Sequence, residues 1–348
     1  ITEVKLVKWG GSNKWLPIFL PYLFLKALWI LLFHKISVIY LQDGLLAPLG
    51  YLLKVSRKPV VTTIHGLDIT YKNRLYQFFV PKCVKRLDKV ICISNAAKEE
   101  CLKRGIPEEK ITVISEGVSD EFYMNLKCVD RHRLREKVSV RLGFDLSNKK
   151  ILLSVGRLTE RKGFHWFVEN VLPKIIEGDK DCIYLIAGKG IYREKVREAI
   201  ERRSLKNHVL MLGQVNNEML RYLYNVADVY VMPNIAVEGD MEGFGRVILE
   251  ASSCGLPIVA FGLEGIKDAI KDRENGLLVE PGKTEEFASA ILRLLQNDAE
   301  RERFGERARQ FTLDNFSSER IAERYLEEFQ RVVEGQSPIG GRLDQDAL

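Results

Sequence analysis

The sequence lacks the features that mark several large classes of protein. It has no CxxC pair, no secretory signal ahead of its cysteines and no motif of an RNA- or DNA-binding module. Disulfide scaffolds and structural zinc sites need regularly spaced cysteines. The six present are scattered: Cys83, Cys92, Cys101, Cys128, Cys182 and Cys254. We therefore expect a cytoplasmic protein with reduced thiols, no structural zinc and no nucleic-acid partner.

Length and composition are those of an ordinary globular protein. A chain of 348 residues is long enough for two domains, because one domain usually holds about 100 to 200 residues. Hydrophobic residues make up 46% and charged residues 29% of the chain, which excludes disorder throughout.

Positive charge is concentrated in the first half of the chain. Residues 1–145 hold 24 Lys and Arg against 14 Asp and Glu, and the remainder holds 29 against 33, giving balances of +10 and −4 within the net charge of +6. Basic runs lie at 72–74, 82–86 and 131–137. They can face anionic lipid, nucleic acid or water, with nucleic acid the weakest of the three.

Residues 16–33, LPIFLPYLFLKALWILLF, are apolar on almost every side, with Lys26 as the only charge. The length is near that of a membrane span, but Pro17, Pro21 and Lys26 weaken that interpretation. A surface helix of a soluble protein should show a polar stripe. We expect a peripheral membrane contact; the alternative is a helix packed between the sheet and a neighbouring helix.

Apolar runs of strand length alternate with helical stretches from residue 35 onward. The first series lies at 37–41, 60–64, 89–93 and 111–114, and the second at 151–156, 182–188, 209–213, 229–233, 257–261 and 276–280. This alternation predicts an α/β protein with two doubly wound, Rossmann-like parallel sheets. Ligands of such sheets bind beyond the carboxyl ends of the strands, so the residues there are the candidates for function.

The most informative stretch is EGFGRVILEASSCGLP at residues 242–257. The turn of Gly243, Phe244 and Gly245 enters a helix, whose first amides and positive dipole end suit a phosphate. Glu242 and Glu250 flank it and can accept hydrogen bonds from hydroxyl groups on either side. The stretch therefore indicates a ligand in which a sugar, a diphosphate and a ribose are joined.

Two fixed cations follow a predicted strand in ILLSVGRLTERKG. Arg157 stands just past the strand end and Lys162 five residues later. Such cations can bind a diphosphate and stabilise the negative charge that grows as it leaves. Arg161 competes for the same role, and the alternative for it is exposure to solvent.

These motifs resemble those of the retaining GT-B glycosyltransferases of group 1. That family has two glutamates separated by seven residues, with GFG after the first, as in Glu242 and Glu250 here. The resemblance extends from about Ile36 to Gln330, in the family's order of motifs. It implies two Rossmann-like domains facing a cleft, a last helix that crosses back to the first domain, and transfer of a sugar from a nucleotide-diphosphate donor with retention of configuration.

The resemblance also implies roles for single residues. Arg157 and Lys162 would clasp the donor phosphates in place of a divalent metal, so no metal or other cofactor is expected. Glu250 would bind the ribose, and His65, in HGLD after a strand, would lie beside the donor sugar. The remaining donor contacts would come from Glu242, Gly243, Phe244 and Gly245 for the sugar and phosphate, and from Gln214 and Val215 for the nucleobase.

Some positions depart from the family's pattern. Ser115 and Glu116 stand where the family has Pro-Asn, and we assign them no role. Glu238 begins a near copy of the signature, but only Glu242 is followed by GFG and a second glutamate. The Gly-rich loop after the family's first strand has no clean match, so we expect that an N-terminal piece of the natural protein is absent.

The expected organisation is an acceptor-side domain over residues 1–146, a nucleotide-sugar domain over 147–315, a crossover helix over 316–334 and a disordered tail over 335–348. The acceptor is either lipid-linked, with the protein peripheral on an anionic membrane, or a small soluble sugar. A sugar phosphorylase and a non-catalytic nucleotide-sugar-binding protein remain as other classes; Glu250 argues against the phosphorylase.

Overall fold

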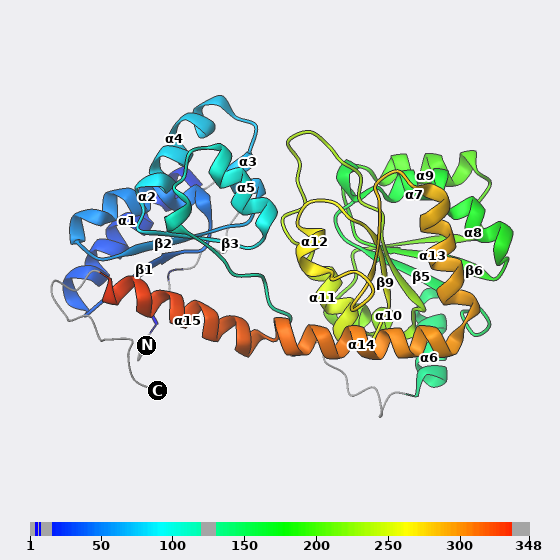
Figure 1. Cartoon of the computed structure of the whole chain (residues 1–348). Helices are drawn as coiled ribbons and strands as arrows, with labels where there is room; N and C mark the ends of the chain where they lie inside the picture. Colours follow the sequence, from blue (N-terminus) through cyan, green and yellow to red (C-terminus); the bar gives the residue numbers. More distant parts are fainter. Residues whose placement is uncertain (1–3, 6, 8–15, 120–129, 336–348) are drawn as a thin grey trace. The chain divides into compact units, whose positions relative to one another are not determined.

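The computed structural model describes residues 4, 5, 7, 16–119 and 130–335, and the chain forms two compact units. The first contains residues 1–114 and 322–348, and the second contains residues 115–321 (Figure 1). Cys128 and residues 336–348 of the expected tail lie outside the described residues.

The first unit is built on a parallel sheet in the order β1-β2-β3-β4. All five residues of β2 are buried, as expected for a parallel strand covered on both faces. The sheet confirms the predicted strands: β1 (Ile39–Leu41), β2 (Val60–Ile64), β3 (Lys89–Cys92) and β4 (Ile111–Val113). The helices of this part are α1 (Leu16–Phe33), η2 (Gly44–Leu46), α2 (Ala47–Leu53), η3 (Lys54–Ser56), α3 (Leu67–Thr70), α4 (Arg74–Arg86), α5 (Asn95–Lys103) and η4 (Glu108–Lys110).

The last helix, α15 (Ser318–Glu334), packs on this same sheet. Successive strand residues face opposite sides, so Ile64 joins the core with α4 while the Thr63 hydroxyl lies 3.2 Å from the Tyr325 hydroxyl of α15. Buried Glu328 accepts a hydrogen bond from Thr112 and forms an ion pair of 3.0 Å with Lys89. The return of the last helix to the first sheet is therefore confirmed.

The second unit contains a parallel six-stranded sheet in the order β10-β9-β8-β5-β6-β7. Its strands confirm the second predicted series: β5 (Lys150–Val155), β6 (Cys182–Ala187), β7 (Val209–Gly213), β8 (Val229–Met232), β9 (Ile258–Phe261) and β10 (Leu277–Val279). The chain runs outward from β5 through β6 to β7 and then returns to β8 on the other side of β5. The switch point of this sheet, where ligands of such folds bind, therefore lies between β5 and β8.

Helices cover both faces of this sheet around an apolar core (Figure 1). They are α6 (Arg131–Leu142), η7 (Glu160–Lys162), α7 (Phe164–Asn170), α8 (Leu172–Gly178), α9 (Arg193–Arg202), α10 (Asn217–Val226), α11 (Arg246–Ser253), α12 (Ile266–Ala269), α13 (Thr284–Gln296) and α14 (Asp298–Phe316).

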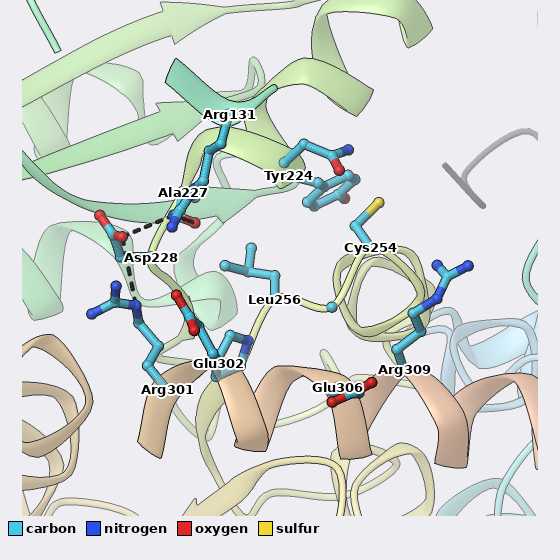
Figure 2. A pocket seen from close by; sticks show the side chains of 13 residues that line it. Arg131, Tyr224, Ala227, Asp228, Cys254, Leu256, Arg301, Glu302, Glu306 and Arg309 are labelled. Carbon is cyan, nitrogen blue, oxygen red and sulfur yellow. Dashed lines mark hydrogen bonds and ion pairs between the residues drawn. The ribbon is translucent and has the colours of Figure 1, made fainter. Parts of the chain in front are cut away.

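Buried Asp228 ties α6 to the second unit. Its carboxylate accepts hydrogen bonds of 2.8 Å from Arg131 and Arg135 of α6 and one of 2.7 Å from the Ile151 amide of β5. Figure 2 shows Asp228 with Arg131 and with Arg301, an ion pair of 3.6 Å. Because these bonds hold α6 to the second sheet, the units divide at residues 114 and 115, earlier than the expected division at 146 and 147.

The predicted helix over residues 16–33 forms as α1, with the same limits. Across the described part of the chain, no helix combines the length and the apolar character needed to cross a membrane. The five described cysteines are free thiols, and Cys92 and Cys101 place their sulfur atoms 3.6 Å apart in the core of the first unit.

Replacing Asp228 should destabilise the second unit strongly. Asp228→Ala leaves the guanidinium groups around it without their buried counter-charge, and we expect the free energy of unfolding to fall by about 3 to 5 kcal/mol. Exposed Asp181, which pairs with Lys149 at 3.0 Å, is the matched control, and Asp181→Ala should cost less than about 1 kcal/mol. Urea denaturation measures both, and equal losses would contradict the structural role of Asp228.

Candidate functional site

Residues after β5 and after β8 meet at the switch point of the six-stranded sheet. Lys162 Nζ lies 2.5 Å from Glu242 Oε2, and Asn234 Nδ2 donates to the same oxygen at 2.8 Å. Arg161 also donates to this oxygen, and its Nε bonds to Asp240 at 2.9 Å. We call Arg161, Lys162, Asn234 and Glu242 the Glu242 cluster.

The Glu242 cluster is buried, so its charges depend on one another. Burial alone would raise the pKa of Glu242, but Lys162 and Arg161 together hold it below its usual value. Burial lowers the pKa of Lys162, while the carboxylate of Glu242 opposes that change. Lys162 and Arg161 thus share the Glu242 carboxylate, and Asp240 supplies a second counter-charge to Arg161.

Gly163 allows the loop after β5 to reach the end of β8. Its φ is +64°, and a Cβ atom there would lie 2.0 Å from the carbonyl oxygen of Pro233. The Ile235 amide donates to the Arg161 carbonyl at 2.9 Å and fastens the two loops together. The KG pair of the sequence therefore supplies both a cation and the close approach that positions it.

Arg161 and Arg157 differ in their surroundings. Arg161 is buried, which excludes the alternative of solvent exposure for this residue. Arg157, by contrast, is exposed, and within the described ranges its guanidinium forms no hydrogen bond or ion pair. Burial is the largest cause of the lowered pKa of Lys162, and the charge of Arg157 adds a smaller decrease. The two predicted phosphate ligands therefore influence each other electrostatically.

The turn of residues 243–245 can contact a ligand through its backbone amides rather than through side chains. The Phe244 ring is buried and stacks edge-on against Phe316, with centroids 5.8 Å apart. Gly245 has a φ of +89° and precedes α11 as its cap. In the part of the chain that the structure describes, no hydrogen bond engages the amides of residues 243–245. These amides remain available to an anion at the start of α11.

Glu250 lies one turn into α11 and accepts a hydrogen bond of 2.9 Å from the Tyr224 hydroxyl. Burial raises the pKa of Glu250, whereas Tyr224 and the charge of Arg246 oppose the rise. Arg246 also forms an ion pair of 3.7 Å with Glu116. Sequence reasoning gave Glu116 no role, since it departs from the family's pattern, yet it stands beside the start of α11.

The loop after β7 places Gln214 at the surface and Val215 half-buried. Neither side chain hydrogen-bonds to the Glu242 cluster among the described residues. The next residue, Asn216, caps α10 by accepting the Met219 amide at 2.8 Å. Glu238, set aside as a copy of the signature's start, is exposed.

His65 belongs to the first unit and follows β2 there. Its Nε2 lies 2.9 Å from the Gln42 carbonyl oxygen, and its amide donates to Asp68 at 2.9 Å. Asp68 also accepts the Gly44 amide, so it joins two loops beyond the strands. Burial raises the pKa of Asp68 to about 6.

The sequence predicted that Lys162 and Glu242 bind the same ligand, but it did not show which residues hold the two side chains in place. No role was predicted for Asn234 or Asp240, and their contacts arise from the fold. Another missed contact is Glu264, whose carboxylate accepts the Glu242 amide at 2.5 Å. In the described ranges, no three or more His, Cys, Asp or Glu residues are grouped to hold a metal ion.

Removing the shared carboxylate should destabilise the second unit. Glu242→Ala leaves Lys162 buried without its counter-charge and Arg161 with Asp240 alone, and we expect a loss of about 3 to 5 kcal/mol in the free energy of unfolding. Glu238→Ala, at an exposed glutamate nearby, is the control and should change it by less than about 1 kcal/mol. A cycle with Lys162→Ala should show coupling of at least about 0.5 kcal/mol; additive losses would contradict the pairing.

Comparison with known proteins gives concordant matches. Residues 142–311 match the family model of glycosyl transferases group 1, and residues 2–122 match that of glycosyltransferase family 4. An uncharacterized glycosyltransferase of Methanocaldococcus jannaschii, MJ1607, is 30% identical over 89% of this chain and 79% of its own length. An Escherichia coli UDP-Gal:alpha-D-GlcNAc-diphosphoundecaprenol alpha-1,3-galactosyltransferase is 30% identical over 68% of this chain and 59% of its own length.

Among solved structures, Anabaena Alr3699/HepE in complex with UDP has a TM-score of 0.76 at 21% identity, covering 90% of this chain and 82% of that one. A likeness at this identity shows the fold, whereas the family models and the relatives show the family. With its two parallel Rossmann-like sheets, the chain belongs to the group 1 glycosyltransferases of GT-B fold.

Proposed function

We propose that this glycosyltransferase moves a sugar from a nucleotide-diphosphate donor to an acceptor with retention of anomeric configuration. The observation that carries the proposal is the buried contact between Lys162 and Glu242 at the switch point of the second sheet. It unites a cation for a phosphate with a carboxylate for a sugar at the edge where ligands of such sheets bind. The Anabaena structure similar to this chain contains UDP, which supports a nucleotide donor.

In this proposal the diphosphate is bound by cations and by backbone. Arg157 is exposed and ready to meet a phosphate, Lys162 carries a second charge, and the amides of residues 243–245 add hydrogen bonds. Negative charge grows on the diphosphate as its bond to the sugar breaks, and preorganised donors stabilise that charge. These groups perform the work that a divalent metal performs elsewhere, so the scheme needs no metal.

The two glutamates hold opposite ends of the donor. Glu250 Oε2 accepts a hydrogen bond from the Tyr224 hydroxyl, and we assign the other carboxylate oxygen of Glu250 to the ribose hydroxyls. Glu242 contacts the donor sugar, and Arg161 acts through Glu242 as a positioning residue. We assign the nucleobase to the loop of Gln214 and Val215, and a contact with the donor sugar to His65.

In this proposal, retention comes from attack on the face of the leaving group, and Glu242 is not the nucleophile. Three donors already bind its Oε2, which lowers its basicity and makes it a poor nucleophile. The acceptor oxygen instead attacks the anomeric carbon from the side of the leaving group. The new carbon–oxygen bond forms as the bond to the phosphate breaks, and the departing phosphate oxygen takes the acceptor's proton.

The acceptor is a lipid-linked sugar or a small soluble sugar, in the synthesis of a glycolipid, polysaccharide or other glycan. The name of the Escherichia coli relative states a diphosphoundecaprenol-linked acceptor, which supports the first class. The basic first half of the chain supports it as well.

A nucleotide panel identifies the donor. We expect one family among UDP, GDP, ADP and their sugar conjugates to raise the melting temperature, since ligand at 100 times its dissociation constant adds about 2.7 kcal/mol of stability. Glu250→Ala should lose this shift, while Glu238→Ala should keep it. A shift that persists in Glu250→Ala would remove Glu250 from the donor site.

With that donor, Arg157→Ala should lower turnover by on the order of a hundredfold, because it removes charge stabilisation of the leaving group. Nucleoside-diphosphate release measures this turnover. Arg203→Ala, at another exposed arginine of the second unit, should leave it unchanged. Full activity of Arg157→Ala would contradict the assigned role.

A further inference from the structure

Helix α1 carries an exposed apolar stripe. Ile18, Tyr22, Leu25, Trp29 and Leu32 are spaced by four, three, four and three residues, so they lie on one face of the helix. Each of these side chains is between 53% and 79% exposed. Single exposed apolar residues are ordinary on a protein surface, but a row of this length marks an interaction site.

The apolar surface continues over the neighbouring helices, since α2 packs against both α1 and α4. Leu52 and Val55 are exposed at the end of α2 and in η3, and Leu75, Phe78 and Phe79 are exposed on α4. We use the name docking face for these five residues together with the stripe on α1.

Cations are interleaved with the apolar side chains of the docking face. Residues 16–86 contain ten Lys and Arg but only Asp43 and Asp68 as acids. Both acids are engaged by backbone amides of the loop after β1, Asp43 by Leu45 and Asp68 by Gly44. Lys82 Nζ lies 3.4 Å from the centre of the Phe78 ring, and Arg86 lies 5.4 Å from that of Tyr51.

We propose that the docking face binds the surface of an anionic lipid bilayer. Exposed Leu, Ile and Phe can enter the boundary between headgroups and acyl chains, and Trp29 and Tyr22 suit the interface itself. Lysine and arginine stems can lie along the apolar layer while their charges reach lipid phosphates. The first unit alone carries this surface, so the proposal does not rest on the donor site of the second unit.

Other occupants fit these observations less well. A second copy of the chain would bring the same excess of positive charge against itself, which opposes association. A soluble polyanion such as RNA would satisfy the cations but leave the row of Ile, Leu and Trp in water. Of these three occupants, only an anionic bilayer can contact both the cations and the apolar side chains.

Vesicle flotation of the full chain tests the proposal. The probes are vesicles of phosphatidylcholine alone and of phosphatidylcholine with one quarter phosphatidylglycerol. We expect the chain to float with the anionic vesicles at low salt and to bind the neutral vesicles at least about tenfold more weakly. Binding to the anionic vesicles should weaken at high salt, because screening shortens the reach of the charges.

Two kinds of variant separate the contributions of charge and apolar surface. Trp29→Glu and Leu25→Glu should each weaken vesicle binding by about tenfold or more, since each removes an inserted side chain. Lys82→Glu should weaken it by about fivefold or more. The matched control is Ile191→Glu, because Ile191 is 87% exposed in the second unit and its change should leave binding unaltered.

Three results would overturn the proposal. The first is a wild-type chain that stays with neither vesicle, and the second is equal loss of binding in Ile191→Glu and Trp29→Glu. The third is a wild-type dimer in sedimentation equilibrium that Trp29→Glu converts to a monomer, which would assign the face to a second copy. The donor-induced thermal shift, measured on the same variants, reports separately on the proposed function.

Discussion

The site of the second unit depends on the burial of opposite charges at the edge of its sheet. Taking Lys162 and Glu242 out of water costs several kcal/mol per ion, and only close pairing with further hydrogen bonds offsets that cost. Asn234 and Arg161 supply those bonds. The pairing is feasible because Gly163 lets the loop after β5 touch the end of β8. The fixed turn that follows Glu242 then starts α11 and sets the place of Glu250.

The Glu242 carboxylate binds both Lys162 and Arg161. In the proposed function a diphosphate would contact Lys162, whose side chain Glu242 positions. The protein therefore needs little rearrangement of Lys162, and preorganised charges of this kind are the most effective in stabilising a transition state. Arg157, which remains in solvent, is the cation whose surroundings would change most on binding.

Much of the fold follows from local patterns. Buried parallel strands are continuous apolar runs, so the ten strands of the described residues could be located, and α1 keeps the limits of its apolar run. The roles of Arg161 and Asp228 could not be predicted in this way. Arg161 stands in a charged stretch that is typical of solvent exposure, and its burial arises from Asp240 and Glu242, about 80 positions later. Asp228 holds α6 through Arg131 and Arg135, again across a long separation.

A crystal structure with the stabilising nucleotide would show whether a nucleotide sugar binds at the switch point of the second sheet. We predict that the diphosphate contacts Lys162, Arg157 and the amides of residues 243–245, with the ribose against Glu250. Away from the Glu242 cluster, the second unit has a cavity of about 440 Å³, lined by Asp228, Arg301 and Arg309 among others (Figure 2). A nucleotide bound in that cavity, without contact to the Glu242 cluster, would contradict the proposed donor site.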